Sequence, residues 1–507
     1  MSLDSALSVA TSSLSNIALG YTLISQNVAN ASTPGYAAES ETTYSLDAGG
    51  LGFGAEAGPT QVATNASLQT ALYAQNAASS AAQTYAAALG NLQAVQGAVG
   101  SGTDLGSLLT NLQNGFTALQ ANPADQTQQT SVVNAATAVT QQINTLAASF
   151  SGAEQAAQNS LVTQVGQLNT ALGQLGQLNT QIIALQGQGG STADLQNQRN
   201  QVLTTISGLT SVNFISQANG NILVYTTAGT QLPTDTPNPL SLAPATTGPT
   251  VYYPGGGLPG IELDGTDVTA SLTGGSIGAN ITLRDTTLPT YLGTLDGFAQ
   301  GLASRFAAQG LSLFTDPAGN VPAQTGASAQ SGFVGFSADI TVNPAVVANP
   351  ALVVNGNLTI AGSPTGATAF TPNPTGQAGF TGLIDRVLSF ALGDDVQAGV
   401  GQPAIATTGL GPAGNLNADF SGGQSLQDFA TAQTAGAAQD SNTATTAQTE
   451  AAATQTTLGN NLRASTGVDI DSQLANLVQL QNAYAANAKI ISTVQSLYAI
   501  LLNEPSG

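Results

Sequence analysis

Apolar side chains at the two ends of the chain recur at alternating spacings of four and three residues. Near the N-terminus these positions are Leu3, Leu7, Ala10, Leu14, Ile17, Tyr21, Ile24 and Val28. Near the C-terminus they are Leu477, Leu480, Tyr484, Asn487, Ile491, Val494, Tyr498 and Leu501, with Asn487 as the only amide among them. This heptad spacing is typical of helices that pack along one another. A pair of ordinary core helices would show it too, but its presence at both ends favours a coiled coil formed by the two termini.

The pattern between these two helices predicts a mainly helical body. A region rich in Ala, Gln, Ser and Thr indicates five helices, and a further helix is expected over residues 288–309. The five helices are expected over residues 68–99, 105–120, 127–150, 153–186 and 193–209. Glycine and proline end helices, so Gly100-Ser101-Gly102 and Ala121-Asn122-Pro123 mark breaks between them. From residue 424 to the C-terminus the pattern is again mostly helical.

Two segments interrupt the helical pattern. Two apolar runs, residues 212–215 and 222–225, flank a turn that contains Asn219-Gly220, and this pattern indicates a β-hairpin. Short strands are expected to continue to about residue 283, and residues 314–379 form a second, turn-rich stretch. We therefore predict a mainly α chain with inserted β domains, elongated and built from several domains. The expected domains are a terminal coiled coil (1–64 and 465–507), a helical body (65–210, 284–313 and 380–464), an inserted β domain (211–283) and a smaller mixed insertion (314–379).

Composition excludes several classes of function. The 507 residues include 27 Asp and Glu against 6 Lys and Arg, a net charge of −21, and neither cysteine nor histidine. Without these two residue types there is no thiolate nucleophile, no Ser-His-Asp triad and no usual zinc or haem ligand set. We expect no catalytic residue, no cofactor and no metal. Six scattered cations do not form the basic cluster that nucleic acids require, so no nucleic-acid partner is expected.

Hydropathy and the N-terminal sequence bear on where the chain acts. No stretch resembles the run of about 18 apolar residues that a membrane helix needs, so we expect no membrane insertion. The first residues lack the basic segment that opens a secretory signal. The chain is therefore expected to stay in the cytoplasm or to leave by a route that reads no cleavable signal.

Several motifs resemble those of one family of flagellar proteins. Residues 27–36 (NVANASTPGY) resemble the N-terminal signature of flagellar rod, hook and first hook-associated proteins. Residues 467–471 (GVDID), 474–477 (LANL) and 481–491 (QNAYAANAKII) are similar to the matching C-terminal signature. Four further motifs narrow the resemblance to the flagellar hook-associated protein 1 family. They are residues 121–125 (ANPAD), 194–199 (DLQNQR), 283–289 (LRDTTLP) and 339–344 (DITVNP).

The resemblance implies a non-enzymatic, axial component of the bacterial flagellum. It implies a ring of subunits at the hook–filament junction that adapts the flexible hook to the stiff filament. The implied partners are copies of the chain itself, hook protein, the second hook-associated junction protein and a flagellar export chaperone. The implied location is extracellular, after export through the flagellar type III apparatus without a cleaved signal peptide. The assembly signature expected from the two conserved-looking ends is Asn27, Asn30, Pro34, Gly35, Tyr36, Leu477, Leu480, Tyr484, Ile491, Val494, Tyr498 and Leu501.

Two alternatives stay open at this point. Another axial protein, such as hook protein or flagellin, would share parts of the terminal pattern. Hook protein should be mostly β between its ends, and flagellin should lack the residue 27–36 string. An enzyme of the peptidoglycan hydrolase type would need a cleft with paired carboxylates. No convincing pair is present in the sequence.

Overall fold

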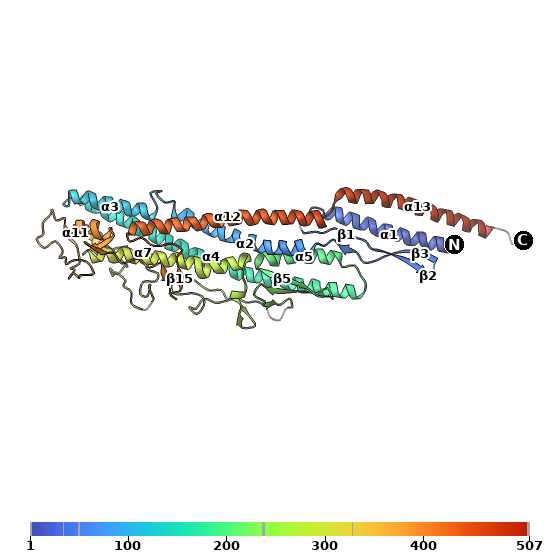
Figure 1. Ribbon diagram of the computed structural model, residues 1–507, viewed down its shortest axis with the longest axis horizontal. Helices are drawn as coiled ribbons and strands as arrows, with labels where there is room; N and C mark the ends of the chain where they lie inside the picture. Colours follow the sequence, from blue (N-terminus) through green and yellow to red (C-terminus); the bar gives the residue numbers. More distant parts are fainter. Residues whose placement is uncertain (1–2, 34, 49–50, 236–238, 327, 504–507) are drawn as a thin grey trace.

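The molecule is a long, narrow rod whose main helices run along its length (Figure 1). The computed structural model describes residues 3–33, 35–48, 51–235, 239–326 and 328–503. Helices account for 59% of the chain and the strands are few and short, which confirms the mainly α, elongated architecture. The N-terminal and C-terminal helices lie at the same end of the rod (Figure 1).

Within the described residues, eight long helices and several short ones form the rod. The long helices are α1 (Leu3–Asn30), α2 (Ala66–Gln96), α3 (Leu105–Ala121), α4 (Gln126–Gly187), α5 (Ala193–Leu209), α7 (Leu288–Ala308), α12 (Leu426–Thr466) and α13 (Ile470–Asn503). The short ones are α6 (Gly275–Thr282), α8 (Phe336–Asp339), α9 (Pro344–Ala348), α10 (Leu352–Asn355), α11 (Gly382–Arg386), η1 (Thr269–Ser271), η2 (Leu283–Thr287) and η3 (Val387–Ala391).

Polar caps explain where the body helices begin. The Asp104 carboxylate accepts a hydrogen bond from the backbone N–H of Ser107 at 3.1 Å, at the start of α3. The Asp125 carboxylate accepts from the N–H of Thr127 at 2.8 Å, at the start of α4. Such caps satisfy N–H groups that the first helical turn leaves free. The breaks predicted at 100–102 and 121–123 therefore lie between α2, α3 and α4.

Helix α4 is one uninterrupted helix where the sequence predicted two, over 127–150 and 153–186. Ser151-Gly152, between the predicted pieces, lies within it. A glycine inside a helix costs about 1 kcal/mol relative to alanine. Buried apolar residues continue on both sides, with Phe150 before the glycine and Ala157 and Leu161 after it. Packing on both sides outweighs the local cost, so the helix does not break.

The body has two hydrophobic cores that α4 joins. The first lies among α3, the first half of α4, α7 and the start of α12, and it includes Phe116, Phe150, Phe298, Phe306 and Phe429. The second lies between the second half of α4, α5 and the β insertion, and it includes Leu161, Leu175, Ile206, Val224 and Ile277. A single 62-residue helix thus sets the distance between the two cores.

The β insertion contains the predicted hairpin but ends earlier than expected. Strands β5 (Val212–Ser216), β6 (Ile222–Thr226) and β7 (Gln231–Leu232) form an antiparallel sheet in that order, and β8 (Glu262–Leu263) pairs with β9 (Thr266–Asp267). The expectation of strands up to residue 283 is wrong, because α6 begins at Gly275 and continues through η2 into α7. Ile277 and Ile281, four residues apart, both contact the second core, which is helical spacing.

The remaining strands form small two-stranded pairs. They are β1 (Glu39–Ser40) with β4 (Gln61–Val62), β2 (Thr43–Ala48) with β3 (Leu51–Ala57), β10 (Phe314–Thr315) with β11 (Thr341–Val342), β12 (Asp395–Gln397) with β13 (Val400–Gly401), and β14 (Thr408–Leu410) with β15 (Leu416–Asn417). The last two pairs lie within residues 380–464, which the sequence assigned to the helical body. There the chain becomes helical again only at Leu426.

Two buried carboxyl groups in the body predict a contribution to stability that is lost as pH rises. Burial raises the pKa of Asp296 to about 6, and burial together with the neighbouring Asp285 raises the pKa of Glu154 to about 8. The folded state then binds protons that the unfolded chain has already released. The stabilising contribution of Glu154 is complete below its unfolded pKa of about 4.5 and is lost as pH rises to about 8.

The measurement is chemical unfolding of the full chain between pH 4 and pH 9. As pH rises over this range, we expect the free energy of unfolding of wild type to decrease by up to roughly 4 kcal/mol more than that of the Glu154→Gln protein. The difference between the two proteins removes the effect of all other titrating groups. A difference that stays constant with pH would contradict the prediction.

Candidate assembly interface

The N-terminal and C-terminal helices lie side by side and run in opposite directions (Figure 1). The Asn487 amide of α13 donates to the Ser13 hydroxyl of α1 at 3.0 Å, and the Tyr498 hydroxyl donates to Asp4. Leu480 lies over Gly20, where a Cβ atom would come within 2.9 Å of the Leu480 Cδ1 atom. Residues later in α13 contact residues earlier in α1, from Gly20 to Asp4, so the two helices are antiparallel. That the pair forms a coiled coil stays a prediction.

The predicted C-terminal seam is covered only in part. Leu477, Leu480, Ile491 and Tyr498 are partly covered, and Val494 is buried. In contrast, the Tyr484 and Leu501 side chains are 52% and 62% exposed. The heptad assignment therefore places these two residues on the α1 side, whereas the structure leaves them largely open.

Helix α13 carries a second apolar surface that sequence reasoning missed. We use the name outer face of α13 for its exposed large apolar side chains, which are distributed around the helix: Ile470, Leu474, Val478, Tyr484, Ile490, Leu497, Ile500, Leu501 and Leu502. Its side chains are between 45% and 83% exposed. Exposed apolar surface on this scale marks an interaction site in a soluble protein. The sequence pattern that could have indicated this surface is the pair of neighbouring apolar residues Ile490-Ile491, because two adjacent residues of a helix cannot both lie on one narrow apolar stripe.

Hydropathy alone would assign these helices to a membrane. Helix α1, and the run from α12 through α13 (Leu426–Leu502), are long and apolar enough to cross one by length and composition. The expectation that no stretch meets this criterion is therefore wrong. Core helices of soluble proteins meet it as well, and α1 packs against both α13 and strand β3. The absence of membrane insertion stays a prediction.

The N-terminal signature forms a tight junction at the end of α1. Asn27 is buried, and its amide nitrogen donates to the Glu39 carbonyl at 2.8 Å. Its side-chain oxygen accepts from the Glu39 N–H at 2.9 Å and from the Tyr36 hydroxyl at 3.0 Å. One side chain thus acts as a strand partner for the returning chain. Gly35 makes the turn with φ of +79°, a conformation that favours glycine.

The other two signature residues of this turn are Asn30 and Pro34. Asn30 makes local contacts only: its amide donates to the Gln26 carbonyl at 3.1 Å and its oxygen accepts from the Thr33 hydroxyl at 3.4 Å. Pro34 lies outside the described residues. The strongest structural role in the turn therefore belongs to Asn27.

A second asparagine, from the middle of the chain, holds the same segment. The Asn197 side chain in α5 accepts from the Ala37 N–H at 3.0 Å and donates to the Ala37 carbonyl at 3.1 Å. It also donates to the Glu39 carboxylate at 2.9 Å. The Ala38 N–H donates to the carbonyl of Thr466, at the end of α12, at 2.7 Å. Residues 37–39 are thus fixed between α1, α5 and α12. We call this cluster the clamp: Asn27, Tyr36, Ala37, Ala38, Glu39, Asn197 and Thr466.

The clamp joins two motifs that the sequence presented separately. Asn197 belongs to the DLQNQR motif and Asn27 to the NVANASTPGY motif, and no sequence signal connects these two motifs. Arg199 of the same motif donates to the Gly220 carbonyl at 2.7 Å, which holds the β5–β6 turn. Burial raises the pKa of the Glu39 carboxyl, with a contribution from the nearby Asp194 and an opposing one from the Asn197 hydrogen bond. Burial likewise raises the pKa of the Tyr36 hydroxyl above its ordinary value.

Valine at Gly20 is expected to weaken the contact between α1 and α13, because its side chain would overlap Leu480. Overpacking of this kind costs typically 1–3 kcal/mol. The measurement is hydrogen exchange of α1 amides, which should quicken by tenfold or more. Gly90→Val in α2 is the matched control, since a Cβ atom at Gly90 has no neighbour within 4 Å among the described residues. Equal effects of the two substitutions would contradict the packing at Gly20.

Comparisons with known proteins find similarity to flagellar proteins over several parts of the chain. A model described as the flagellar hook-associated protein FlgK helical domain matches residues 89–319, and one described as the flagellar basal body rod FlgEFG protein C-terminal matches residues 464–504. Flagellar hook-associated protein 1 of Escherichia coli (strain K12) is 25% identical over 456 residues, covering 79% of this chain and 81% of that protein.

Among solved structures, the flagellar hook junction protein FlgK from Burkholderia pseudomallei is 25% identical with a TM-score of 0.41. That match covers 51% of this chain and 46% of the other. The helical domain match contains α3, α4, α5 and α7, and the rod-type match contains most of α13. In its helical body and its last helix the chain is therefore similar to the flagellar hook-associated protein 1 family.

Proposed function

We propose that this chain forms the junction ring between hook and filament and adapts the flexible hook to the stiff filament. The observation that carries the proposal is the outer face of α13. One face of α13 packs on α1, and the outer face is apolar and uncovered at the end of the rod. A ring of copies covers such a face with neighbouring subunits.

The energetic argument favours assembly over a solitary chain. Burying a large apolar side chain contributes about 1.5–3 kcal/mol. Nine such side chains lie on the outer face of α13, each at least 45% exposed. Neighbouring subunits that cover half of this surface would gain several kcal/mol per contact. Apolar side chains distributed around one helix suit a layer in which each helix touches more than one partner.

The proposed partners follow from the family. They are further copies of this chain, hook protein on one side, the second hook-associated junction protein on the other, and a flagellar export chaperone before assembly. We place the chain outside the cell, after export through the flagellar type III apparatus without a cleaved signal peptide. Its role is structural and not enzymatic.

The proposed division into domains assigns each part a layer. Residues 1–64 and 465–507 would form the inner tube, and residues 65–210, 284–313 and 380–464 the next layer. Residues 211–283 and 314–379 would project outward. The helices α2 to α5 disfavour the alternative of a hook protein, for which strands are expected in this region.

The test is genetic. Bacterial cells that lack this chain are expected to build hooks of normal length and to release unpolymerised flagellin into the medium. The full chain supplied in trans should restore filaments, whereas a chain that ends before Ile470 should not. Filaments of normal length on cells without the chain would overturn the proposed function.

A further inference from the structure

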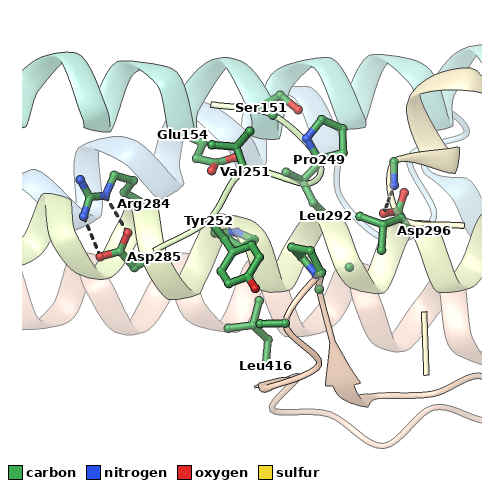
Figure 2. Close-up of a pocket in the computed structure, with 18 of the residues that line it drawn as sticks. Ser151, Glu154, Pro249, Val251, Tyr252, Arg284, Asp285, Leu292, Asp296 and Leu416 are labelled. Atoms are coloured by element: carbon green, nitrogen blue, oxygen red, sulfur yellow. Dashed lines mark hydrogen bonds and ion pairs between the residues drawn. The ribbon is translucent and has the colours of Figure 1, made fainter. Parts of the chain in front are cut away.

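A partly closed pocket lies between the helical body and the β insertion. Helices α4 and α7, the 248–253 loop of the insertion and the loop between β14 and β15 form its walls. Figure 2 shows Glu154 and Ser151 on one side of it and Leu416 on the other. The cavity volume, counted as the space that the centre of a water molecule can occupy, is about 50 Å³. One water needs about 10–15 Å³ by this measure, so the space fits a ligand head group of a few heavy atoms.

Most charged groups around this pocket already have partners. The Asp285 carboxylate receives two hydrogen bonds from the Arg284 guanidinium, at 2.6 and 2.9 Å, drawn as dashed lines in Figure 2. Arg284 also donates to the Gln158 side-chain oxygen at 2.7 Å. The Asp296 carboxylate accepts from the N–H groups of Gly335 and Ser337 and from the Ser337 hydroxyl, at 2.6–2.9 Å.

Glu154 has no such partner. Its side chain lines the pocket and is 4% exposed, yet none of the described residues donates a hydrogen bond to it. Buried polar groups are almost always hydrogen-bonded, and a buried charge without a partner is costly. Protonation relieves part of this cost, since burial and the Asp285 charge raise the pKa of Glu154. Once ionised, the carboxylate needs a positive charge beside it.

Among the described residues, Arg284 supplies that charge only in part: its charge opposes the rise in the pKa of Glu154, but it donates no hydrogen bond to the Glu154 carboxylate. Six cationic side chains exist in the sequence, all within the described residues, and of these only Arg284 lines the pocket. The Nε and Nη2 atoms of Arg284 already donate to Asp285, and its Nη1 atom donates to Gln158. Apolar groups complete the walls, namely Val251, Leu292 and Leu416, together with the Tyr252 ring. The pocket thus offers one free carboxylate at the edge of an apolar space.

We propose that this pocket binds a small organic ammonium ion, whose N–H groups donate to the Glu154 carboxylate and whose carbon part lies against Val251, Leu292 and Leu416. Bound there, the ion ties the β insertion to α4 and α7. The inference does not depend on assembly into a ring, so it can fail or succeed independently of the proposed function.

The test uses the purified full chain with methylammonium chloride as the probe and sodium chloride at equal ionic strength as the reference. The readouts are calorimetric titration and the melting temperature. We expect saturable binding to wild type at pH 8.5, with a rise of a few degrees in melting temperature. At pH 6, where Glu154 holds its proton, binding should be at least tenfold weaker. Asp296, whose pKa is about 6, also changes its charge over this range, so the Glu154→Gln protein is titrated at both pH values to separate the two groups.

Two variants and a control make the outcome decisive. Glu154→Gln should abolish binding, and Leu416→Phe should reduce it at least tenfold by filling the pocket without changing any charge. Glu450→Gln, an exposed position on α12, should bind like wild type. Equal responses to sodium and methylammonium, or undiminished binding by a folded Glu154→Gln or Leu416→Phe protein, would overturn the inference.

Discussion

Serine at Leu474, Val478 and Ile490 is expected to abolish assembly of this chain on the hook while the monomer stays folded. These three side chains belong to the outer face of α13 and are 46–54% exposed, so they contribute little to contacts within one chain. Burying the exposed half of each in an assembled ring would contribute about 1 kcal/mol per side chain. A loss of roughly 3 kcal/mol at each contact lowers an association constant by about a hundredfold.

The measurement is occupancy of isolated hooks by the purified chain, counted by electron microscopy, together with motility of complemented cells. The matched control is serine at Ile183, Val99 and Val347, which are equally apolar and 37–53% exposed but lie on the body. Circular dichroism should show the same helix content in both variants. If the α13 variant decorates hooks as wild type does, the outer face is not the assembly surface.

Alanine at Asn27 is expected to detach the terminal helices from the body of the rod. The substitution leaves the N–H and the carbonyl of Glu39 and the Tyr36 hydroxyl without their shared partner. Each buried group left unsatisfied costs about 1–3 kcal/mol, so the three groups together cost roughly 3–9 kcal/mol. This is a large part of the stability of an ordinary domain.

Hydrogen exchange is the suitable measurement, because it separates local opening from global unfolding. Amides of α1 and of residues 37–40 should exchange at least a hundredfold faster in Asn27→Ala, whereas those of α4 should not change. Asn27→Asp keeps the acceptor but loses the donor, so its exchange rates should lie between those of wild type and Asn27→Ala. Asn30→Ala is the control, since its contacts are local. Similar effects of the Asn27 and Asn30 substitutions would show that the clamp does not depend on Asn27.

The helices were the most predictable part of this fold. Heptad spacing located α1 and α13, and the Asp104 and Asp125 caps explain why the predicted boundaries of α3 and α4 lie within a few residues of the observed ones. Local signals of this kind act over one or two turns. They failed at Ser151-Gly152, where packing on both sides overrides a helix-weakening glycine, and at Gly275, where α6 starts within an expected strand region.

The assembly site was less predictable, because its contacts join distant parts of the chain. Nothing local in the sequence connects Asn27 to Asn197, although each lies in a motif that indicated the family. A search for one apolar stripe also placed Tyr484 and Leu501 on the α1 side of α13. Both residues are largely exposed, because the spacing of apolar residues gives the side of a helix but not how far a neighbouring helix covers it.

The meeting of both chain termini at one end of the rod limits how this protein can be labelled. A fluorescent protein fused to either terminus would stand where α1 and α13 pair, and would block access to the outer face. The turn between β12 and β13 offers a better attachment point, because Ala398 and Gly399 are exposed there and α11, shortly before them in the chain, lies at the opposite end (Figure 1). A cysteine introduced at Ala398 would be unique in this chain and would carry a dye without touching the terminal helices.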